Sequence, residues 1–163
     1  MIRDLPCHTC LRRADRSRRA GGAPRPGRAG PLLAAGLGYG GSPIPLPVLH
    51  CLLAMTDAGL YQVYGATEVS GVATVLDSAD HRAPIDDRHL SSAGRPLAGI
   101  EVSITATTTG EAAPAGEVGE ILLRGEQVMA GYWNQPAGTK PALLPGGWLH
   151  TGDAGSSSTG SRT

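Results

Sequence analysis

The sequence predicts an α/β fold in two parts, a partial α/β layer over residues 31–90 and a β-rich subdomain over residues 91–153. In the first part, apolar residues at helical spacing lie between short apolar segments, a pattern typical of a helix beside strands. In the second part, apolar and polar residues alternate, as they do in half-buried strands. The chain of 163 residues is long enough for one modest core, because domains typically hold about 100 to 200 residues.

The two ends of the chain differ from this central part. Residues 1–30 carry eight Arg and two Asp without an apolar period, so we expect this Arg/Gly/Pro-rich segment to be disordered. Residues 154–163 are rich in Ser, Thr and Gly and are expected to form a flexible tail. Cys7 and Cys10 have the spacing of a zinc-ligand pair, but a structural zinc site needs a second pair. Nucleic-acid contact and a transit peptide are alternative interpretations of the arginines; we expect no nucleic-acid partner, because no aromatic residues are interleaved with them.

The first part begins with a strand end, a glycine turn and a helix. Leu37 leads into the glycine turn at residues 38–42, and the prolines of residues 43–47 are tolerated in a first helical turn, where a missing N–H needs no partner. Gly59 is expected to end the helix in a left-handed conformation. The helix itself is predicted from apolar residues at roughly helical spacing: Leu46, Leu49, Leu52, Leu53 and Met55.

Two strands and a loop complete the first part. Residues 60–64 are predicted to form a strand that ends in the turn 65–68, at the edge where open α/β sheets place their ligands. Residues 72–76 are a second short strand candidate. Residues 77–90 are polar and charged, and a loop is expected there around Pro84.

The second part is predicted to contain a pair of antiparallel strands. Residues 92–97 open it, Thr109-Gly110 supplies a turn, and residues 118–123 return as the partner strand. The first strand of the pair is predicted from apolar residues that alternate with polar ones: Ile100, Val102, Ile104 and Ala106.

Three motifs follow one another along the chain: Tyr64-Gly65-Ala66-Thr67-Glu68, the stretch 119–136, and Thr151-Gly152-Asp153. Carboxylates, a hydroxyl and an aromatic ring in glycine-rich turns suit the binding of a polyphosphate nucleotide. In this order the motifs resemble the AMP-forming adenylating enzymes, which include acyl-CoA synthetases, luciferases and peptide-synthetase adenylation domains. The resemblance covers approximately residues 38–155. It implies a fragment of the large N-terminal domain of such an enzyme, with a distorted barrel as its β-rich part.

The resemblance also implies roles for the first motif. Glu68 would be a ligand of Mg²⁺, and Thr67 would donate its hydroxyl to a phosphate, so these two are the expected catalytic residues. Tyr64 would offer its ring to the adenine, with Gly65 and Ala66 completing the nucleotide-binding turn. Alternatively, the Thr-Glu pair only caps a helical turn and the tyrosine only fills the core.

Roles outside the first motif are implied in the same way. Gly40, Gly41 and Ser42 are similar to the adenine-side glycine turn of the family, although any flexible linker contains such residues. Asp153 is similar to the aspartate that accepts hydrogen bonds from the ribose hydroxyls; alternatively it is an ordinary turn residue. Gly71 lies where family members line the acyl pocket. We expect the carboxylates at positions 68 and 153 to face one nucleotide-sized cavity.

The function implied by the resemblance is that of an AMP-forming acid–thiol ligase, with acyl-CoA synthetases favoured over peptide-synthetase domains. ATP and Mg²⁺ would activate a fatty or other carboxylic acid, with coenzyme A as co-substrate. The phosphate-binding loop and C-terminal lysine of the family are not found, so we expect a truncated or frame-shifted, inactive fragment. The alternatives are a non-catalytic remnant and a peptide-synthetase adenylation domain. No apolar run reaches the roughly 18 to 20 residues that span a bilayer, so we expect a cytoplasmic protein without a transmembrane segment.

Overall fold

The computed structural model describes residues 36–82, 86–106 and 110–158. The chain divides into two compact units. Unit 1 comprises the residues up to Tyr61 together with Asp77–Ser92, and unit 2 comprises Gln62–Leu76 together with the residues from Ala93 onward. The segment 1–30, expected to be disordered, lies outside the described residues. No helix within the described ranges combines the length and the apolar character that a bilayer crossing requires.

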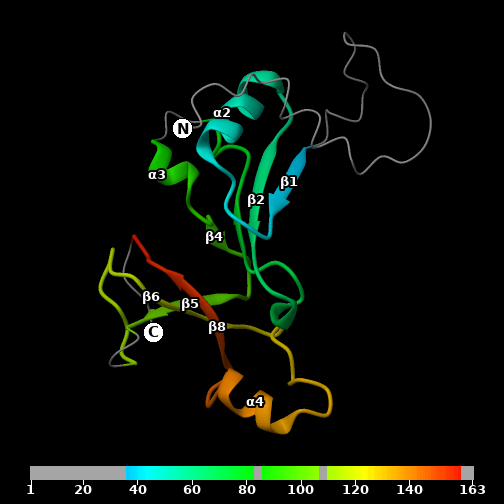
Figure 1. The fold of residues 1–163 in the computed structure, drawn as a ribbon, viewed down its shortest axis with the longest axis vertical. Helices are drawn as coiled ribbons and strands as arrows, with labels where there is room; N and C mark the ends of the chain where they lie inside the picture. The colour runs from blue at the N-terminus through cyan, green and yellow to red at the C-terminus, as the bar shows by residue number, and fades with distance from the viewer. Residues whose placement is uncertain (1–35, 83–85, 107–109, 159–163) are drawn as a thin grey trace, which may run out of the picture. The chain divides into compact units, whose positions relative to one another are not determined.

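Unit 1 is built from short elements around a small apolar core. It contains β1 (Leu37–Gly40), α2 (Leu46–Met55), the first residues of β2 (Leu60–Tyr64), and α3 (Asp87–Leu90) (Figure 1). The predicted helix and the strand at 60–64 are therefore confirmed. The core consists of one fully or almost fully buried leucine from each of α2, β2 and α3: Leu49, Leu60 and Leu90.

Three local expectations in unit 1 are wrong. Strand β1 continues through Gly40, so only the end of the expected glycine turn is a turn, with Gly41 at φ +77°. Helix α2 ends without a left-handed glycine, because its C-cap Thr56 is extended and donates its N–H to the carbonyl of Leu52. Gly59 lies in a close contact instead, since a Cβ there would lie 3.1 Å from the Tyr61 ring. The expected loop 77–90 contains α3, which the Asp86 carboxylate caps.

The first sheet has the strand order β1-β2-β3-β4. In unit 2, the end of β2 pairs antiparallel with β3 (Thr74–Leu76), and β3 pairs antiparallel with β4 (Arg95–Pro96). A single turn of 3₁₀ helix, η3 (Thr67–Val69), lies between β2 and β3. The turn 65–68 follows the C-terminal end of β2, as predicted, and leads through η3 to β3, which pairs antiparallel with β2.

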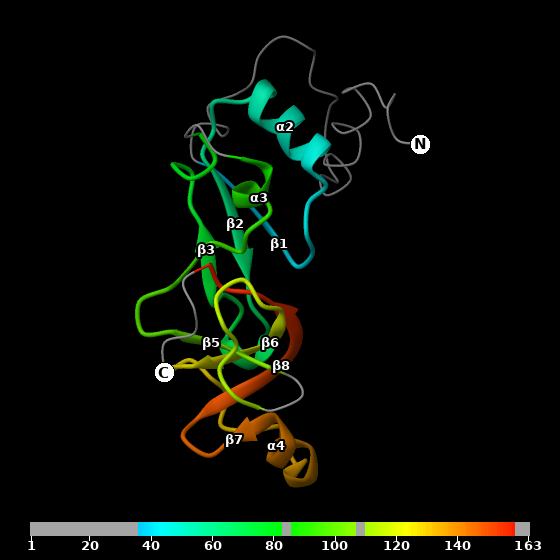
Figure 2. The same ribbon diagram turned by 90° about the vertical axis from the view of Figure 1, so that its left-hand side faces the viewer.

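The second sheet of unit 2 is a curled, antiparallel half-barrel with the order β5-β6-β8-β7 (Figure 2). Strands β5 (Glu101–Thr105) and β6 (Gly119–Arg124) form the predicted pair, with Glu101 opposite Arg124 and Thr105 opposite Glu120. This confirms an antiparallel β-rich part. Sequence patterns missed α4 (Pro136–Ala142), β7 (Leu143–Leu144) and β8 (Trp148–Gly155). Strand β8 extends two residues into the expected flexible tail.

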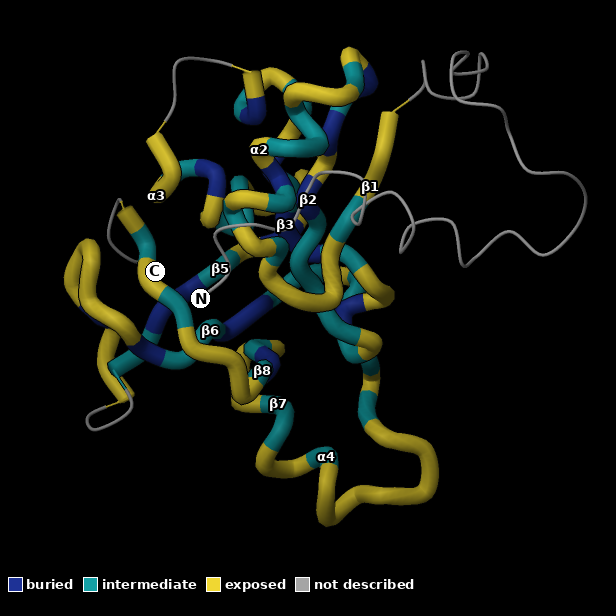
Figure 3. The backbone as a smooth tube through the Cα atoms, turned by 45° about the horizontal axis from the view of Figure 1, so that its top comes forward, coloured by how far each residue is buried: buried dark blue, intermediate teal, exposed yellow. Residues whose placement is uncertain are grey.

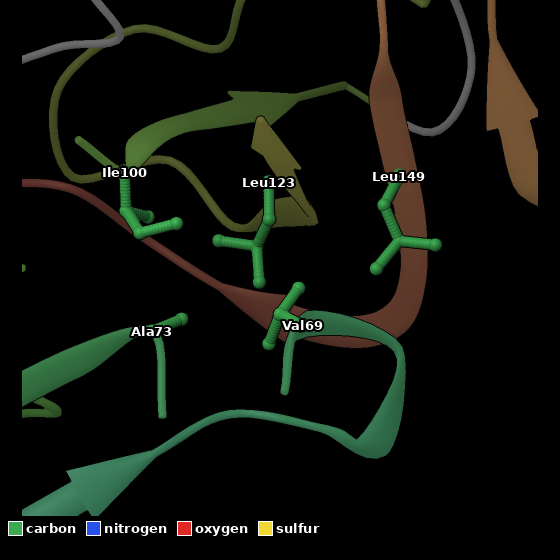
Figure 4. Close-up of a cluster of buried hydrophobic side chains, with 5 residues drawn as sticks. All are labelled: Val69, Ala73, Ile100, Leu123 and Leu149. Atoms are coloured by element: carbon green, nitrogen blue, oxygen red, sulfur yellow. The ribbon is translucent and has the colours of Figure 1, made fainter. Parts of the chain in front are cut away.

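The core of unit 2 joins the turn after β2 to the second sheet. Three of its buried side chains lie within elements: Val69 in η3, Leu123 in β6 and Leu149 in β8 (Figure 4). The other two directly precede strands: Ala73 precedes β3 and Ile100 precedes β5. By contrast, α4 and the segment before it run along the surface, and α4 has no buried residue (Figure 3). The buried cluster of unit 2 therefore includes Val69, the residue that directly follows the first sequence motif.

Candidate functional site

The turn after β2 is tight, and its glycines are required by geometry. A Cβ on Gly65 would lie 2.3 Å from the carbonyl oxygen of Gly71, so no other residue fits there without a shift of the backbone. Ser70 and Gly71 have φ values of +60° and +103°. The N–H of Gly71 closes the turn by donating to the carbonyl of Ala66 at 3.0 Å. The motif thus forms a closed loop on the end of β2.

Val69 fixes this loop to the half-barrel. Its side chain is fully buried and points toward Leu123 of β6 and Leu149 of β8 (Figure 4). The residues before it are more accessible: Thr67 is exposed and Glu68 is half-buried. Burial of one apolar side chain therefore sets the position of the two polar side chains that precede it.

Tyr64 and Asp153, from the first and last motifs, are joined by a hydrogen bond. The Tyr64 hydroxyl donates to Oδ2 of Asp153 at 2.8 Å across 89 positions of sequence. Burial raises the pKa of Tyr64 to about 12, and the hydrogen bond to the Asp153 carboxylate adds to the increase. The hydroxyl is therefore protonated at neutral pH, where it acts as a donor that orients the carboxylate.

A bulge in β8 brings Asp153 to this position. Leu122 of β6 lies opposite His150, but Glu120 lies opposite Ala154, so β8 holds two extra residues between these pairs. Gly152 adopts φ +74° in the bulge. The Thr151 hydroxyl donates to the carbonyl of Ile121 at 2.7 Å and accepts from the N–H of Asp153 at 3.1 Å. The Thr-Gly-Asp motif is thus a bulge that re-aims one carboxylate.

Glu120 holds this bulge from the neighbouring strand. Its Oε1 accepts the N–H of Gly152 at 3.1 Å, and its Oε2 lies 3.0 Å from Nδ1 of His150. One carboxylate therefore bonds to β8 on both sides of Thr151. Glu120 lies in the middle motif, but no local pattern in the sequence indicates this contact, because its partners are on another strand.

Glu68 is bonded to a second segment of unit 2. The Tyr132 hydroxyl donates to Oε1 of Glu68 at 2.8 Å, and the N–H of Met129 donates to the Glu68 carbonyl at 2.7 Å. The hydrogen bond to Glu68 is the main cause of a raised pKa for the Tyr132 hydroxyl. Tyr132 also received no role from the sequence, because its partner is 64 positions away.

Further hydrogen bonds attach the loop before Tyr132 to the turn. Nε2 of Gln127 donates to the carbonyl of Val72 at 2.6 Å. The Ser70 hydroxyl donates to the carbonyl of Gln127 at 3.0 Å. The middle motif therefore supports the first motif through both its backbone and its side chains.

The donor set is suited to Mg²⁺ held mainly by other ligands. Among the described residues, no group of three or more His, Cys, Asp or Glu side chains could hold a metal ion. Mg²⁺ commonly binds through one or two carboxylates, with waters and substrate phosphates as the other ligands. A single half-buried carboxylate, that of Glu68, fits this mode and does not fit a metal site made of protein ligands alone.

Unit 2 brings together most of the residues predicted for the site. It contains Tyr64, Gly65, Ala66, Thr67, Glu68, Gly71 and Asp153. Gly40, Gly41 and Ser42 belong to unit 1, where β1 ends. Two open cavities of unit 2 are lined by other residues, one including Ser103 and Trp148 and the other including Gly99 and Gln127. A cavity shared by the carboxylates at 68 and 153 stays a prediction.

The sequence matches the family described as AMP-binding enzyme over residues 10–133. The match begins upstream of residue 38, where the resemblance was expected to start, and it ends before the Thr-Gly-Asp motif. It therefore extends into the Arg-rich segment that sequence patterns had set apart.

Curated relatives include ligases for several acids. The fatty acid–[acyl-carrier-protein] ligase ScoC of Streptomyces coeruleorubidus is 38% identical over 117 residues, which are 72% of this chain and 22% of the relative. A long-chain-fatty-acid–CoA ligase of Salmonella typhimurium is 37% identical over 115 residues, 70% of this chain and 19% of the relative. A feruloyl-CoA synthase of Amycolatopsis sp is 40% identical over 116 residues, which are 70% of this chain and 22% of the relative. The chain spans about a fifth of the length of these relatives.

Solved structures share the fold of this chain. The amide bond synthetase McbA from Marinactinospora thermotolerans has a TM-score of 0.64 and 37% identity, covering 74% of this chain and 23% of that protein. The o-succinylbenzoate coenzyme A synthetase from Bacillus subtilis, in complex with ATP and a magnesium ion, has a TM-score of 0.63 and 31% identity, covering 73% and 23%. Both similarities cover about three quarters of the chain.

Proposed function

Because the chain belongs to the family of AMP-binding enzymes, we propose that it carries part of the nucleotide site of an AMP-forming acid–thiol ligase. In this reaction a carboxylate oxygen attacks the α-phosphorus of ATP, which gives an acyl-adenylate and pyrophosphate. The thiol of coenzyme A then attacks the acyl carbon and AMP leaves. The chain spans about a fifth of its curated relatives, so this activity is proposed for the whole protein.

The observation that carries the proposal is the hydrogen bond between Tyr64 and Asp153. It joins the first residue of the first motif to the last motif, although the two are 89 positions apart in sequence. An ordinary turn aspartate has no need of a half-buried tyrosine as a partner. An aspartate that binds two hydroxyl groups does need a fixed orientation, because both of its oxygens must be aimed at the ligand.

Each predicted site residue in unit 2 then has a proposed role. Asp153 accepts hydrogen bonds from the ribose hydroxyls, and Tyr64 presents its ring to the adenine while its hydroxyl orients Asp153. Gly65 and Ala66 form the backbone of the nucleotide-binding turn. Thr67 is the exposed hydroxyl that donates to a phosphate. Glu68 is the carboxylate that would hold Mg²⁺, which when bound neutralises charge on the phosphates.

Two further assignments complete the proposal. Gly40, Gly41 and Ser42 form the adenine-side turn, where absent or small side chains let the backbone approach a base. Gly71 borders the acyl pocket, and a Cβ at this position would meet no atom within 4 Å, which is consistent with room for an acyl chain. Acyl-carrier protein is a second candidate for the acceptor of the acyl group, because the Streptomyces relative that is 38% identical is named for it.

The test is the affinity for Mg·ATP, measured by isothermal titration calorimetry. Asp153→Asn is expected to weaken ATP binding by about tenfold or more, because it removes charged hydrogen bonds to the ribose. The same substitution is expected to leave binding of 2′,3′-dideoxy-ATP unchanged, since this ligand lacks both hydroxyls. Glu68→Gln is expected to weaken ATP binding only when Mg²⁺ is present.

The matched control is Glu117→Gln, an exposed carboxylate of the same unit. It is expected to bind like the wild type. Equal losses for ATP and dideoxy-ATP in Asp153→Asn would contradict the ribose role. Nucleotide binding that none of these variants changes would favour a non-catalytic remnant over a ligase.

A further inference from the structure

The segment 129–132 forms hydrogen bonds with both the side chain and the backbone of Glu68. Its carboxylate accepts the Tyr132 hydroxyl at 2.8 Å, and its carbonyl accepts the N–H of Met129 at 2.7 Å. The next residue, Val69, is fully buried. Backbone, side chain and following residue are thus all fixed, which leaves the carboxylate of Glu68 little rotational freedom.

Tyr132 is itself held by the start of α4. Its N–H donates to Oγ1 of Thr139 at 2.9 Å, and the Thr139 hydroxyl donates to the carbonyl of Gln135, also at 2.9 Å. The N–H of Gln135 returns to the carbonyl of Tyr132 at 3.1 Å. Gly131 leaves room for this contact, because a Cβ there would lie 2.8 Å from Cγ2 of Thr139.

These hydrogen bonds lie outside the buried core of unit 2. Tyr132 is 39% exposed, and none of the residues of α4 is buried. A chain of polar contacts therefore runs from Thr139 through Tyr132 to Glu68, at the surface, where it contributes little to burial of apolar area. Such a chain is typical of groups that orient a metal-binding carboxylate.

We propose that Tyr132 is a positioning residue for Glu68: its hydroxyl holds one carboxylate oxygen, so that the other is presented to the Mg²⁺ of Mg·ATP. This inference rests on the proposed function, in which Glu68 is the Mg²⁺ ligand. A carboxylate held in its binding orientation loses less conformational entropy when the cation binds. Thr139 acts one step further away, by fixing the backbone of Tyr132.

The test is the coupling between Mg²⁺ and ATP, taken as the ratio of the ATP Kd without Mg²⁺ to the ATP Kd with Mg²⁺. Tyr132→Phe keeps the ring and removes the hydroxyl. It is expected to lower this ratio by about 3- to 10-fold, the effect of one hydrogen bond to a charged group at an exposed site. Its ATP Kd without Mg²⁺ is expected to match that of the wild type. Tyr61→Phe, at an exposed tyrosine of unit 1, is the matched control and is expected to keep the ratio.

Thr139 supplies an independent pair of variants. Thr139→Val removes the hydroxyl at almost constant shape and is expected to lower the coupling ratio in the same direction as Tyr132→Phe. Thr139→Ser keeps the hydroxyl and is expected to retain the ratio. Retention by serine and loss by valine would identify the hydrogen bond, and not the side-chain volume, as the cause.

The outcomes separate the inference from the function on which it rests. A wild-type chain whose ATP affinity does not respond to Mg²⁺ would overturn the proposed role of Glu68, and the positioning role with it. Normal coupling in the wild type together with unchanged coupling in Tyr132→Phe would overturn the positioning role alone. Equal loss of ATP affinity with and without Mg²⁺, accompanied by a lower thermal unfolding midpoint, would show that Tyr132 only stabilises the fold.

Discussion

The Tyr64 hydroxyl couples the site to pH. Its folded-state pKa is raised to about 12 from an ordinary value of 10.0, first by burial and then by the Asp153 carboxylate. A group with a raised folded pKa contributes stability that is complete below its unfolded pKa and is lost as the pH rises through its folded pKa. The pH window for this loss therefore runs from about 10 to about 12.

We expect the free energy of unfolding to fall between pH 10 and pH 12, and to fall less steeply in Tyr64→Phe than in the wild type. Urea denaturation at each pH measures the free energy of unfolding of both proteins. The difference between wild type and Tyr64→Phe cancels the contributions of the other tyrosines. Asp153→Asn is expected to lower the pKa of Tyr64 only in part, because burial is the larger cause. Identical pH profiles for the wild type and Tyr64→Phe would contradict the assignment.

Single residues of the site were predictable to different degrees. The resemblance of short motifs identified Tyr64, Glu68 and Asp153 as candidates, because residue type and order are properties of the sequence. It did not identify their partners. Tyr132 and Glu120 bond across 64 and 32 positions, and such pairings depend on how strands pack, which no local pattern reports.

Among the elements, β8 has the most consequence for the site. Its bulge is held by Glu120 through the N–H of Gly152 and the ring of His150. We expect Glu120→Ala to lower the free energy of unfolding by about 1 kcal/mol, the usual loss for a partly exposed hydrogen bond, and to speed amide exchange at Gly152. Glu120→Gln retains an oxygen for the N–H and is expected to protect Gly152 better.

Hydrogen–deuterium exchange followed by NMR checks this prediction amide by amide. Leu149, which lies in β8 before the bulge, is the internal reference and should exchange equally slowly in the wild type and in Glu120→Gln. Protection of Gly152 that survives in Glu120→Ala would show that the bulge does not depend on this carboxylate.

The elements that sequence patterns found are those with a clear apolar period. Helix α2 and the pair β5–β6 have such a period, and both were predicted. Strand β8 was missed because its alternation is interrupted by the bulge. Helix α4 was missed because it contains Pro141 and buries nothing, so it has no apolar face to detect. Helix α3 is four residues long, too short for any period.

At the scale of the molecule, each unit has its own buried cluster. The chain passes between the units within β2, after Leu76 and after Ser92, and the segment Gln62–Leu76 belongs to unit 2, where its residues Val69 and Ala73 pack against the half-barrel. Sequence patterns cannot place such a boundary, since it follows from which side chains pack together and not from changes in composition along the chain.

We expect large-to-small substitutions to report on the two units separately. Leu49→Ala is expected to lower the free energy of opening, measured by amide exchange, in unit 1. Leu123→Ala is expected to lower it in unit 2. Each loss should be about 2 to 5 kcal/mol, because both side chains are fully buried. Native-state hydrogen exchange measures both effects in one experiment. Loss of protection in unit 2 caused by Leu49→Ala would contradict the division of the core.

The even number of extra residues in β8 has an evolutionary consequence. An insertion of two keeps the side chains on either side in the same alternation, whereas an insertion of one would exchange the inner and outer faces of every residue that follows. Lineages could therefore gain or lose the dipeptide as a unit without refolding the sheet. In such a lineage the half-barrel would persist, but the carboxylate at position 153 would no longer lie beside the Tyr64 hydroxyl.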